Sequence, residues 1–215
     1  MTAEMTETHT TLADTSGYGN NGTNHGAICR EDSPFHVVGS GGGKRALSFD
    51  GVNDWVGLPE PPAESTNINT GSVSAWIKTS NAGNSYRGIV VKQLAYGMFL
   101  RDNLFVIYDW SSGEKSTGIN LADGNWHFVG FTFQSGVTDG TKLYIDSQLK
   151  LTTTLTISNQ NEGVAIGAGV NPASAQFFTG LIDEVRIYSQ ALSLAEIQKH
   201  YAEGLGRYRL TQINK

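Results

Sequence analysis

Apolar and polar residues alternate with a period of two along much of the chain. The alternation is clearest in Ser72–Lys78, Phe128–Gln134 and Lys142–Asp146. Because successive side chains of a strand point to opposite faces of its sheet, each stretch is predicted to be a strand with one buried face. Shorter or less regular stretches predict further strands at Arg45–Asp50, Trp55–Leu58, Gly88–Lys92, Gly97–Arg101, Leu104–Tyr108, Leu149–Ile157, Val164–Ile166 and Phe177–Tyr188.

The segments between these strands carry turn signals. Asp50-Gly51, Ser112-Gly113, Asp123-Gly124 and Asp139-Gly140 are dipeptides that favour tight turns. Many short strands at close spacing are typical of an antiparallel sandwich or barrel. Strands do not alternate with helices, which argues against a parallel sheet. The predicted fold class is therefore all-β.

One helix is predicted near the end of the chain. Ser193-Leu194-Ala195-Glu196 has the pattern of a capping box, with a hydroxyl at the N-cap and a carboxylate three residues later. Leu194, Ile197 and Tyr201 then share one face, and Gly204 marks the expected end of the helix. We expect this helix to pack on a sheet edge.

Composition narrows the class of protein. Hydrophobic residues make up 39% of the 215 residues and aromatic residues 10%, which is enough for a packed core. The net charge is −5 and no run of Lys or Arg occurs, so we expect no nucleic-acid partner. The single cysteine, Cys29, excludes an internal disulfide. No apolar stretch is long enough to span a membrane.

The chain is expected to form one domain. Residues 1–11 are polar and lack the apolar region of a signal peptide. Residues 12–204 hold the predicted strands and the helix, and 205–215 form a C-terminal tail. Within this tail, Tyr208–Ile213 alternates in polarity and could form an additional strand.

Six segments, in order, resemble laminin-G-like jelly-roll domains of the concanavalin A-like lectin/glucanase superfamily. These segments are Leu12–Thr23, Ala46–Val56, Val73–Lys78, Gly124–Val129, Leu143–Asp146 and Phe178–Ser193. The resemblance implies an antiparallel β-sandwich of concanavalin A-like, jelly-roll type with one short C-terminal helix.

The chain departs from the family pattern in two places. Ser147 stands where the family usually has Gly, and Met5–Thr10 is too polar for the family's usual first strand. That first strand is therefore absent, degenerate or supplied by another segment. Tyr208–Ile213 could supply it, and so could a neighbouring subunit, by strand addition.

The resemblance also implies a structural calcium ion. Calcium is bound by six to eight oxygen atoms from carboxylates, amides and carbonyls. The candidate ligands are Asp14, Asp50, Asn53, Asp54 and Asp183. The alternative is that these residues only form turns or satisfy backbone donors.

A ligand surface is the second candidate site. Aromatic rings can stack on the C–H faces of sugars while polar groups fix the orientation of the ligand. Polar and aromatic residues of the central strands are the candidates: Tyr86, Arg87, Tyr96, Arg101, Tyr108, Asp109 and Trp110. Among them Trp110, at a strand end, is the best exposed aromatic candidate. Trp76 and Trp126 lie inside alternating strands and are expected in the core.

No catalytic residues are predicted. Glycosidases of this superfamily carry paired carboxylates spaced as E-x-D-x-x-E, and that spacing does not occur here. Asp183 and Glu184 are adjacent, so on a strand they would point to opposite faces. The G-x-S-x-G elbow of serine hydrolases is also missing.

The sequence therefore favours a non-catalytic module that binds a glycan or other surface ligand, or acts in adhesion, at a cell or particle surface. The alternative is a structural or decoration protein of a virion or other assembly, in contact with neighbouring subunits. A polysaccharide-degrading enzyme is the third hypothesis. Oligomeric state separates the first two, because strand exchange favours an assembly and a glycan-binding monomer favours a lectin.

Overall fold

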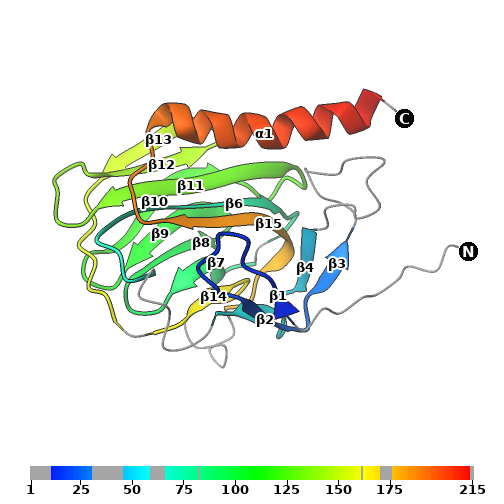
Figure 1. Cartoon of the computed structure of the whole chain (residues 1–215), viewed down its shortest axis with the longest axis horizontal. Coiled ribbons are helices and arrows are strands. Elements are labelled where there is room, and N and C mark those ends of the chain that lie inside the picture. Colours follow the sequence, from blue (N-terminus) through cyan, green and yellow to red (C-terminus); the bar gives the residue numbers. More distant parts are fainter. Residues whose placement is uncertain are drawn as a thin grey trace, which may run out of the picture.

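The computed structural model describes residues 11–30, 46–58, 66–81, 83–160, 162–169 and 176–213, with the backbone alone described for 206–213. The described residues form two antiparallel sheets and one helix (Figure 1). This arrangement confirms the predicted all-β class and the predicted sandwich. No helix in the described part of the chain combines the length and the apolar character needed to cross a membrane.

The first sheet has eight strands in the order β1-β2-β5-β14-β7-β8-β9-β10. Their bounds are β1 Thr11–Leu12, β2 Gly22–His25, β5 Trp55–Gly57, β14 Val164–Ile166, β7 Tyr86–Lys92, β8 Tyr96–Arg101, β9 Leu104–Asp109 and β10 Gly113–Asn120. The last four strands follow one another along the chain as an antiparallel meander, so they bring residues 86–120 together on one part of the sheet.

The second sheet has seven strands in the order β13-β12-β11-β6-β15-β4-β3. Their bounds are β13 Gln148–Thr153, β12 Thr141–Ile145, β11 Trp126–Gln134, β6 Thr70–Lys78, β15 Thr179–Tyr188, β4 Ala46–Asp50 and β3 Ile28–Arg30. The longest ladder joins β6 and β11, which pair from Lys78–Trp126 to Thr70–Gln134.

The inner faces of the two sheets meet in one apolar core. Alternate residues of β8, such as Met98 and Leu100, pack there with alternate residues of β6 and β11, such as Ile77 and Phe131, and all four are fully buried. The alternating pattern read from the sequence therefore reports this inner face. The remaining side chains of each strand point outward. The helix covers those of the seven-stranded sheet and not those of the eight-stranded sheet.

Helix α1, Leu194–Ile213, lies on the outer face of the seven-stranded sheet, along the top of the molecule in Figure 1. The predicted capping box is confirmed, because the Glu196 amide donates to Ser193 Oγ (3.3 Å) and the Ser193 amide donates to Glu196 Oε2 (2.7 Å). The chain before the helix is fixed to β6, where Ser72 Oγ donates to the Gln190 carbonyl and accepts from the Leu192 amide.

Two predictions about the end of the chain are wrong. The helix continues through Gly204 to Ile213, so Gly204 does not end it and Tyr208–Ile213 is not a strand. Gly204 instead allows close packing, since a Cβ atom there would lie 2.5 Å from Cζ2 of Trp76. A glycine that permits contact and a glycine that ends a helix look alike in a sequence.

Strand boundaries also differ from the prediction in several places. The strand predicted over Leu149–Ile157 ends at Thr153, and β2, β3 and β10 were not predicted. The first described strand, β1, has two residues and pairs with β2 at the sheet edge. The polar Met5–Thr10 lies outside the described residues. Ser147, at the family's glycine position, adopts a positive φ of 64° in the β12–β13 turn.

Candidate functional site

The outer face of the eight-stranded sheet carries an aromatic surface. Val91, Phe99 and Val106 are buried there, at 3% exposure or less, and half-buried side chains pack around them. Those surrounding side chains are Tyr86, Leu104, Tyr108 and Trp110. All come from β7, β8, β9 and the turn after β9, and α1 lies on the other sheet. We name the group Tyr86, Phe99, Arg101, Tyr108, Trp110 and Glu114 the aromatic platform.

Strand register brings these residues together. Tyr86 of β7 is paired with Arg101 of β8, and Tyr108 of β9 is paired with Glu114 of β10. Paired residues of antiparallel strands lie on the same face. The rings then contact edge to face, with centroids 5.9 Å apart for Tyr86 and Tyr108 and 5.2 Å apart for Tyr108 and Trp110. The platform is thus a continuous row of rings across the meander.

A polar network fixes one end of the platform. The Tyr86 hydroxyl donates to Glu114 Oε2 (2.6 Å), and Arg101 Nε lies 2.9 Å from the same oxygen. Burial, together with the bond to Glu114, raises the pKa of Tyr86 to about 12, so the hydroxyl stays a donor at neutral pH. The Arg101 guanidinium also lies 5.8 Å from the centre of the Tyr86 ring. These contacts hold Tyr86 in one orientation.

Trp110 owes its position to the turn between β9 and β10. Asp109 Oδ1 accepts from the amides of Ser111 and Ser112 at 2.7 Å each, and Asp109 Oδ2 accepts from the Ser112 hydroxyl. Gly113 follows with a φ of 76°, a conformation that favours glycine. The closed turn presents the Trp110 ring beside Tyr108 on the outer face. The predicted placement of Trp110 at a strand end is therefore confirmed.

Three predicted ligand residues do not present their polar groups on the platform. Tyr96 is fully buried in the core, where its hydroxyl donates to the Thr66 carbonyl, and burial raises its pKa. Asp109 is fully buried and closes its turn. Arg87 donates from Nη1 to the Phe177 carbonyl at 3.2 Å. Tyr96 and Asp109 are thereby removed from the candidate surface, because a ligand cannot reach a side chain without exposed area.

Glu114 and Phe99 belong to the platform but were missed. Glu114 lies in β10, whose sequence Gly113–Asn120 contains one large apolar residue and so gave no alternating signal. Phe99 lies in a predicted strand, and its position on the outer face follows from the parity of that strand. No local sequence signal marked Glu114, because its position opposite Tyr108 depends on the pairing of β9 with β10.

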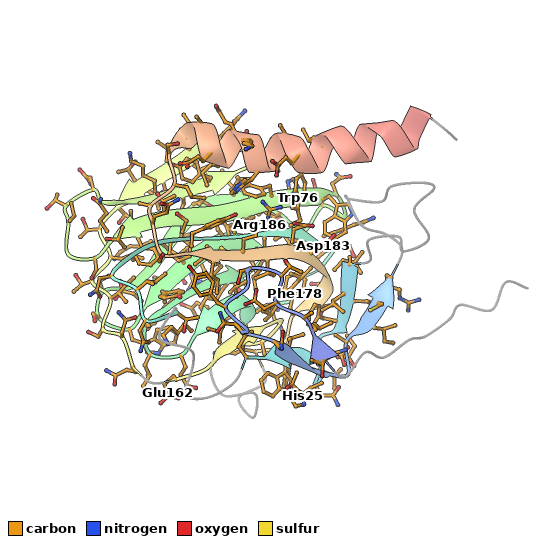
Figure 2. All side chains as sticks on the ribbon, in the orientation of Figure 1. His25, Trp76, Glu162, Phe178, Asp183 and Arg186 are labelled. Carbon is orange, nitrogen blue, oxygen red and sulfur yellow. The ribbon has the colours of Figure 1, made fainter. Side chains whose placement is uncertain are left out.

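The two tryptophans expected in the core have different environments. Trp76 is 2% exposed, but it lies beneath α1 rather than between the sheets, as Figure 2 shows. Its ring stacks on Tyr201 with centroids 5.5 Å apart and rings 8° from parallel. Trp126 is only half-buried at the margin of the same cluster. The burial of Trp76 was predicted correctly, and its location outside the inter-sheet core was not.

The predicted calcium ligands serve the local backbone. Asp14 accepts from the Ser16 amide and hydroxyl and from the Asn20 amide, bonds that lower its pKa. Asp50 accepts from the amides of Val52 and Asn53, in the turn that holds both residues.

The remaining predicted ligands also have local partners. Asp54 accepts from the Asp50 amide, and burial raises the pKa of Asp54, which disfavours its charged form. Asp183 Oδ1 accepts from the Glu184 amide. Among the described residues, no three Asp, Glu, His or Cys side chains gather closely enough to hold a metal ion. The four carboxylates of the predicted set each accept from a nearby backbone amide, and calcium binding by these residues stays a prediction.

Other charged groups also have structural partners. Glu184 Oε2 accepts from Arg186 Nη2 at 2.7 Å, beside a bulge in β15. His127 lies between Asp146 and Asp123, with Nδ1 2.8 Å from Asp146 Oδ2 and Nε2 3.2 Å from Asp123 Oδ1. The hydrogen bond to Asp146 raises the pKa of His127.

Known proteins share this architecture. Domain 4 of AbnA, an extracellular arabinanase from Geobacillus stearothermophilus solved in complex with arabinotriose, is 24% identical with a TM-score of 0.64; the alignment covers 87% of this chain and 91% of that one. The binding domain of Paraclostridial Mosquitocidal Protein 1 is 14% identical with a TM-score of 0.66, over 91% of this chain and 50% of that one. Trypanosoma rangeli sialidase with sialic acid is 12% identical with a TM-score of 0.67, over 91% and 31%.

At this level of identity, these structures establish the fold alone. Comparison with curated proteins finds no match. The family model described as the concanavalin A-like lectin/glucanases superfamily, Laminin_G_3, matches residues 50–198, well over half of the sequence. The matched region includes β6, β11 and β15 and ends within α1. This chain therefore belongs to the concanavalin A-like lectin/glucanases superfamily.

Proposed function

We propose that this protein is a non-catalytic module that binds a glycan, or acts in adhesion through one, at a cell or particle surface. The observation that carries the proposal is the aromatic platform. Tyr108 and Trp110 are only partly buried, and Arg101 and Glu114 supply polar groups beside them. Ring faces for C–H stacking next to fixed hydrogen-bonding groups are what carbohydrate recognition needs.

The similar structures support the same class of function. One was solved with arabinotriose and another is the binding domain of a toxin. The first belongs to an extracellular enzyme, which supports a secreted or surface location for this chain. The superfamily also includes glucanases. We nevertheless propose no catalysis, since the E-x-D-x-x-E carboxylates are missing and Glu114 is engaged by Tyr86 and Arg101.

Binding to a panel of soluble polysaccharides, measured by affinity electrophoresis and then by calorimetry, tests the proposal. We expect retardation by at least one polysaccharide, and a loss of about tenfold or more in affinity for Trp110→Ala and for Tyr108→Ala. Tyr18→Ala is the matched control, because Tyr18 is 74% exposed and lies away from the platform in the turn before β2.

Two results would contradict the proposal. One is wild-type binding that Trp110→Ala and Tyr108→Ala leave intact, which would move the site elsewhere. The other is release of reducing ends from a bound polysaccharide, which would make the protein an enzyme.

A further inference from the structure

The charges on the aromatic platform bear on which glycans it accepts. Arg101 is the cation of the platform, and its side chain keeps 41% of its area exposed. Its Nε lies 2.9 Å from Glu114 Oε2 and 3.9 Å from Asp102 Oδ2. Two carboxylates therefore face one guanidinium. An anionic ligand that approached Arg101 would meet a charge that is already balanced.

Other cations near these strands are directed elsewhere. Lys115 is paired with the core-facing Ile107, and its Nζ donates to the Ser112 carbonyl at 2.9 Å. Arg87 donates to the Phe177 carbonyl. Within the described residues of β7–β10, the platform thus combines one cation, Arg101, with the Glu114 carboxylate, and the neighbouring Asp102 adds a second carboxylate. Like charges brought together across an interface disfavour binding.

We propose that the platform selects uncharged glycans and that Glu114 sets this selectivity. The inference rests on the proposed glycan-binding function and adds the ligand class to it. Stacking on Tyr108 and Trp110 requires no charge on the sugar. The Glu114 carboxylate is only 18% exposed and is held by Tyr86 and Arg101. It repels carboxylate or sulfate groups of a ligand, and its ion pair with Arg101 keeps the guanidinium from binding them. Glu114 acts as a specificity-determining residue.

The experiment compares neutral with acidic polymers. Linear arabinan and xylan serve as uncharged probes, and polygalacturonate and heparin as acidic ones. We expect the wild-type protein to bind at least one neutral polymer and to bind the acidic polymers at least about tenfold more weakly at low salt. Glu114→Gln keeps an oxygen for the Tyr86 hydroxyl and releases Arg101. It should raise the ratio of acidic to neutral affinity by about fivefold or more, in a salt-sensitive way.

Asp139→Asn is the matched control, since it makes the same change in net charge in the β11–β12 connection, on the other sheet. Asp139 has a φ of 56°, which Asn tolerates. Circular dichroism and thermal unfolding of each variant verify the fold.

Each outcome has a separate meaning. A wild-type preference for acidic polymers overturns the selectivity while leaving glycan binding in place. An unchanged affinity ratio in Glu114→Gln, or an equal rise in Asp139→Asn, overturns the role of Glu114. A wild-type protein that binds neither class overturns the proposed function itself, and the selectivity with it.

Discussion

The outer faces of the two sheets carry similar residues and use them differently. On the seven-stranded sheet Trp76, Phe128 and Tyr144 are buried at 3% exposure or less, because α1 covers them with Ile197 and Tyr201. On the eight-stranded sheet Tyr86, Tyr108 and Trp110 remain half-buried around a small apolar cluster from the same strands. Aromatic residues on an outer face are thus buried where the helix packs and partly exposed where it does not.

The largest expected effect is a difference between the outer faces of the two sheets in how much an aromatic substitution lowers the free energy of unfolding. Trp76→Ala removes a buried indole beneath α1 and should lower the free energy of unfolding by about 3–5 kcal/mol. Trp110→Ala removes a half-buried ring on the aromatic platform and should cost about 1 kcal/mol or less. Urea unfolding followed by circular dichroism measures both. Equal losses would show that both faces are structural, and the comparison would fail.

The next effect sharpens the contact between α1 and its sheet. Gly204→Ala improves helix propensity by about 1 kcal/mol, but its Cβ would lie 2.5 Å from Trp76 Cζ2. Overpacking of this kind costs about 1–3 kcal/mol, so we expect a net loss of stability. In a Trp76→Leu background the space opens, and the same substitution should become stabilising. Stabilisation by Gly204→Ala in the wild-type background would show that the helix does not pack this closely.

The sandwich could be predicted from the sequence because the side chains that face the core alternate with polar ones along the strands. It did not predict β10, since Gly113–Asn120 is an edge strand held by backbone bonds to β9 and needs few apolar side chains. It also misplaced the end of α1, because Gly204 serves contact with Trp76 instead of termination.

The candidate site was predicted only in part, because the sequence does not show which alternate residues of a strand face the core. In β8, Tyr96, Met98 and Leu100 face the core, while Phe99 and Arg101 face outward. The sequence Tyr96–Arg101 has bulky side chains on both faces, so neither parity is favoured and Tyr96 was assigned to the wrong side. Tyr86, Tyr108 and Trp110 were assigned to one candidate surface, and the structure brings them together. Their partner Glu114 needed the pairing of β9 with β10, which no local pattern specifies.

A third prediction concerns alkaline pH and the aromatic platform. Burial raises the pKa of Tyr86 from 10.0 to about 12, so the folded state favours the protonated phenol. Its contribution to stability is complete below pH 10 and is lost as the pH rises from 10 to 12. The difference in melting temperature between wild type and Tyr86→Phe should therefore narrow over this range. A constant difference would mean that Tyr86 is as solvated in the folded protein as in the unfolded chain.

The smallest expected effect is a loss of thermal stability at acid pH that involves His200, a residue of α1. His200 stacks on Tyr188 of β15, with ring centroids 5.4 Å apart. Burial, and then the nearby Arg186, lowers the pKa of His200 below 6.5. Because only the unfolded chain binds the proton readily, stability due to His200 is present above pH 6.5 and is lost as the pH falls below it. When the pH falls from 7 to 5, the melting temperature of His200→Gln should decrease less than that of the wild type.

The matched control for this last measurement is His127 of β11, which lies between Asp146 and Asp123. The hydrogen bond to Asp146 raises the pKa of His127, so its contribution is complete below pH 6.5 and is lost as the pH rises through its folded value. His127→Gln should therefore change the slope of melting temperature against pH in the opposite direction. Slopes that move together in the two variants would show that the docking of α1 does not exclude water from His200, and that the covered face is less closed than its aromatic packing indicates.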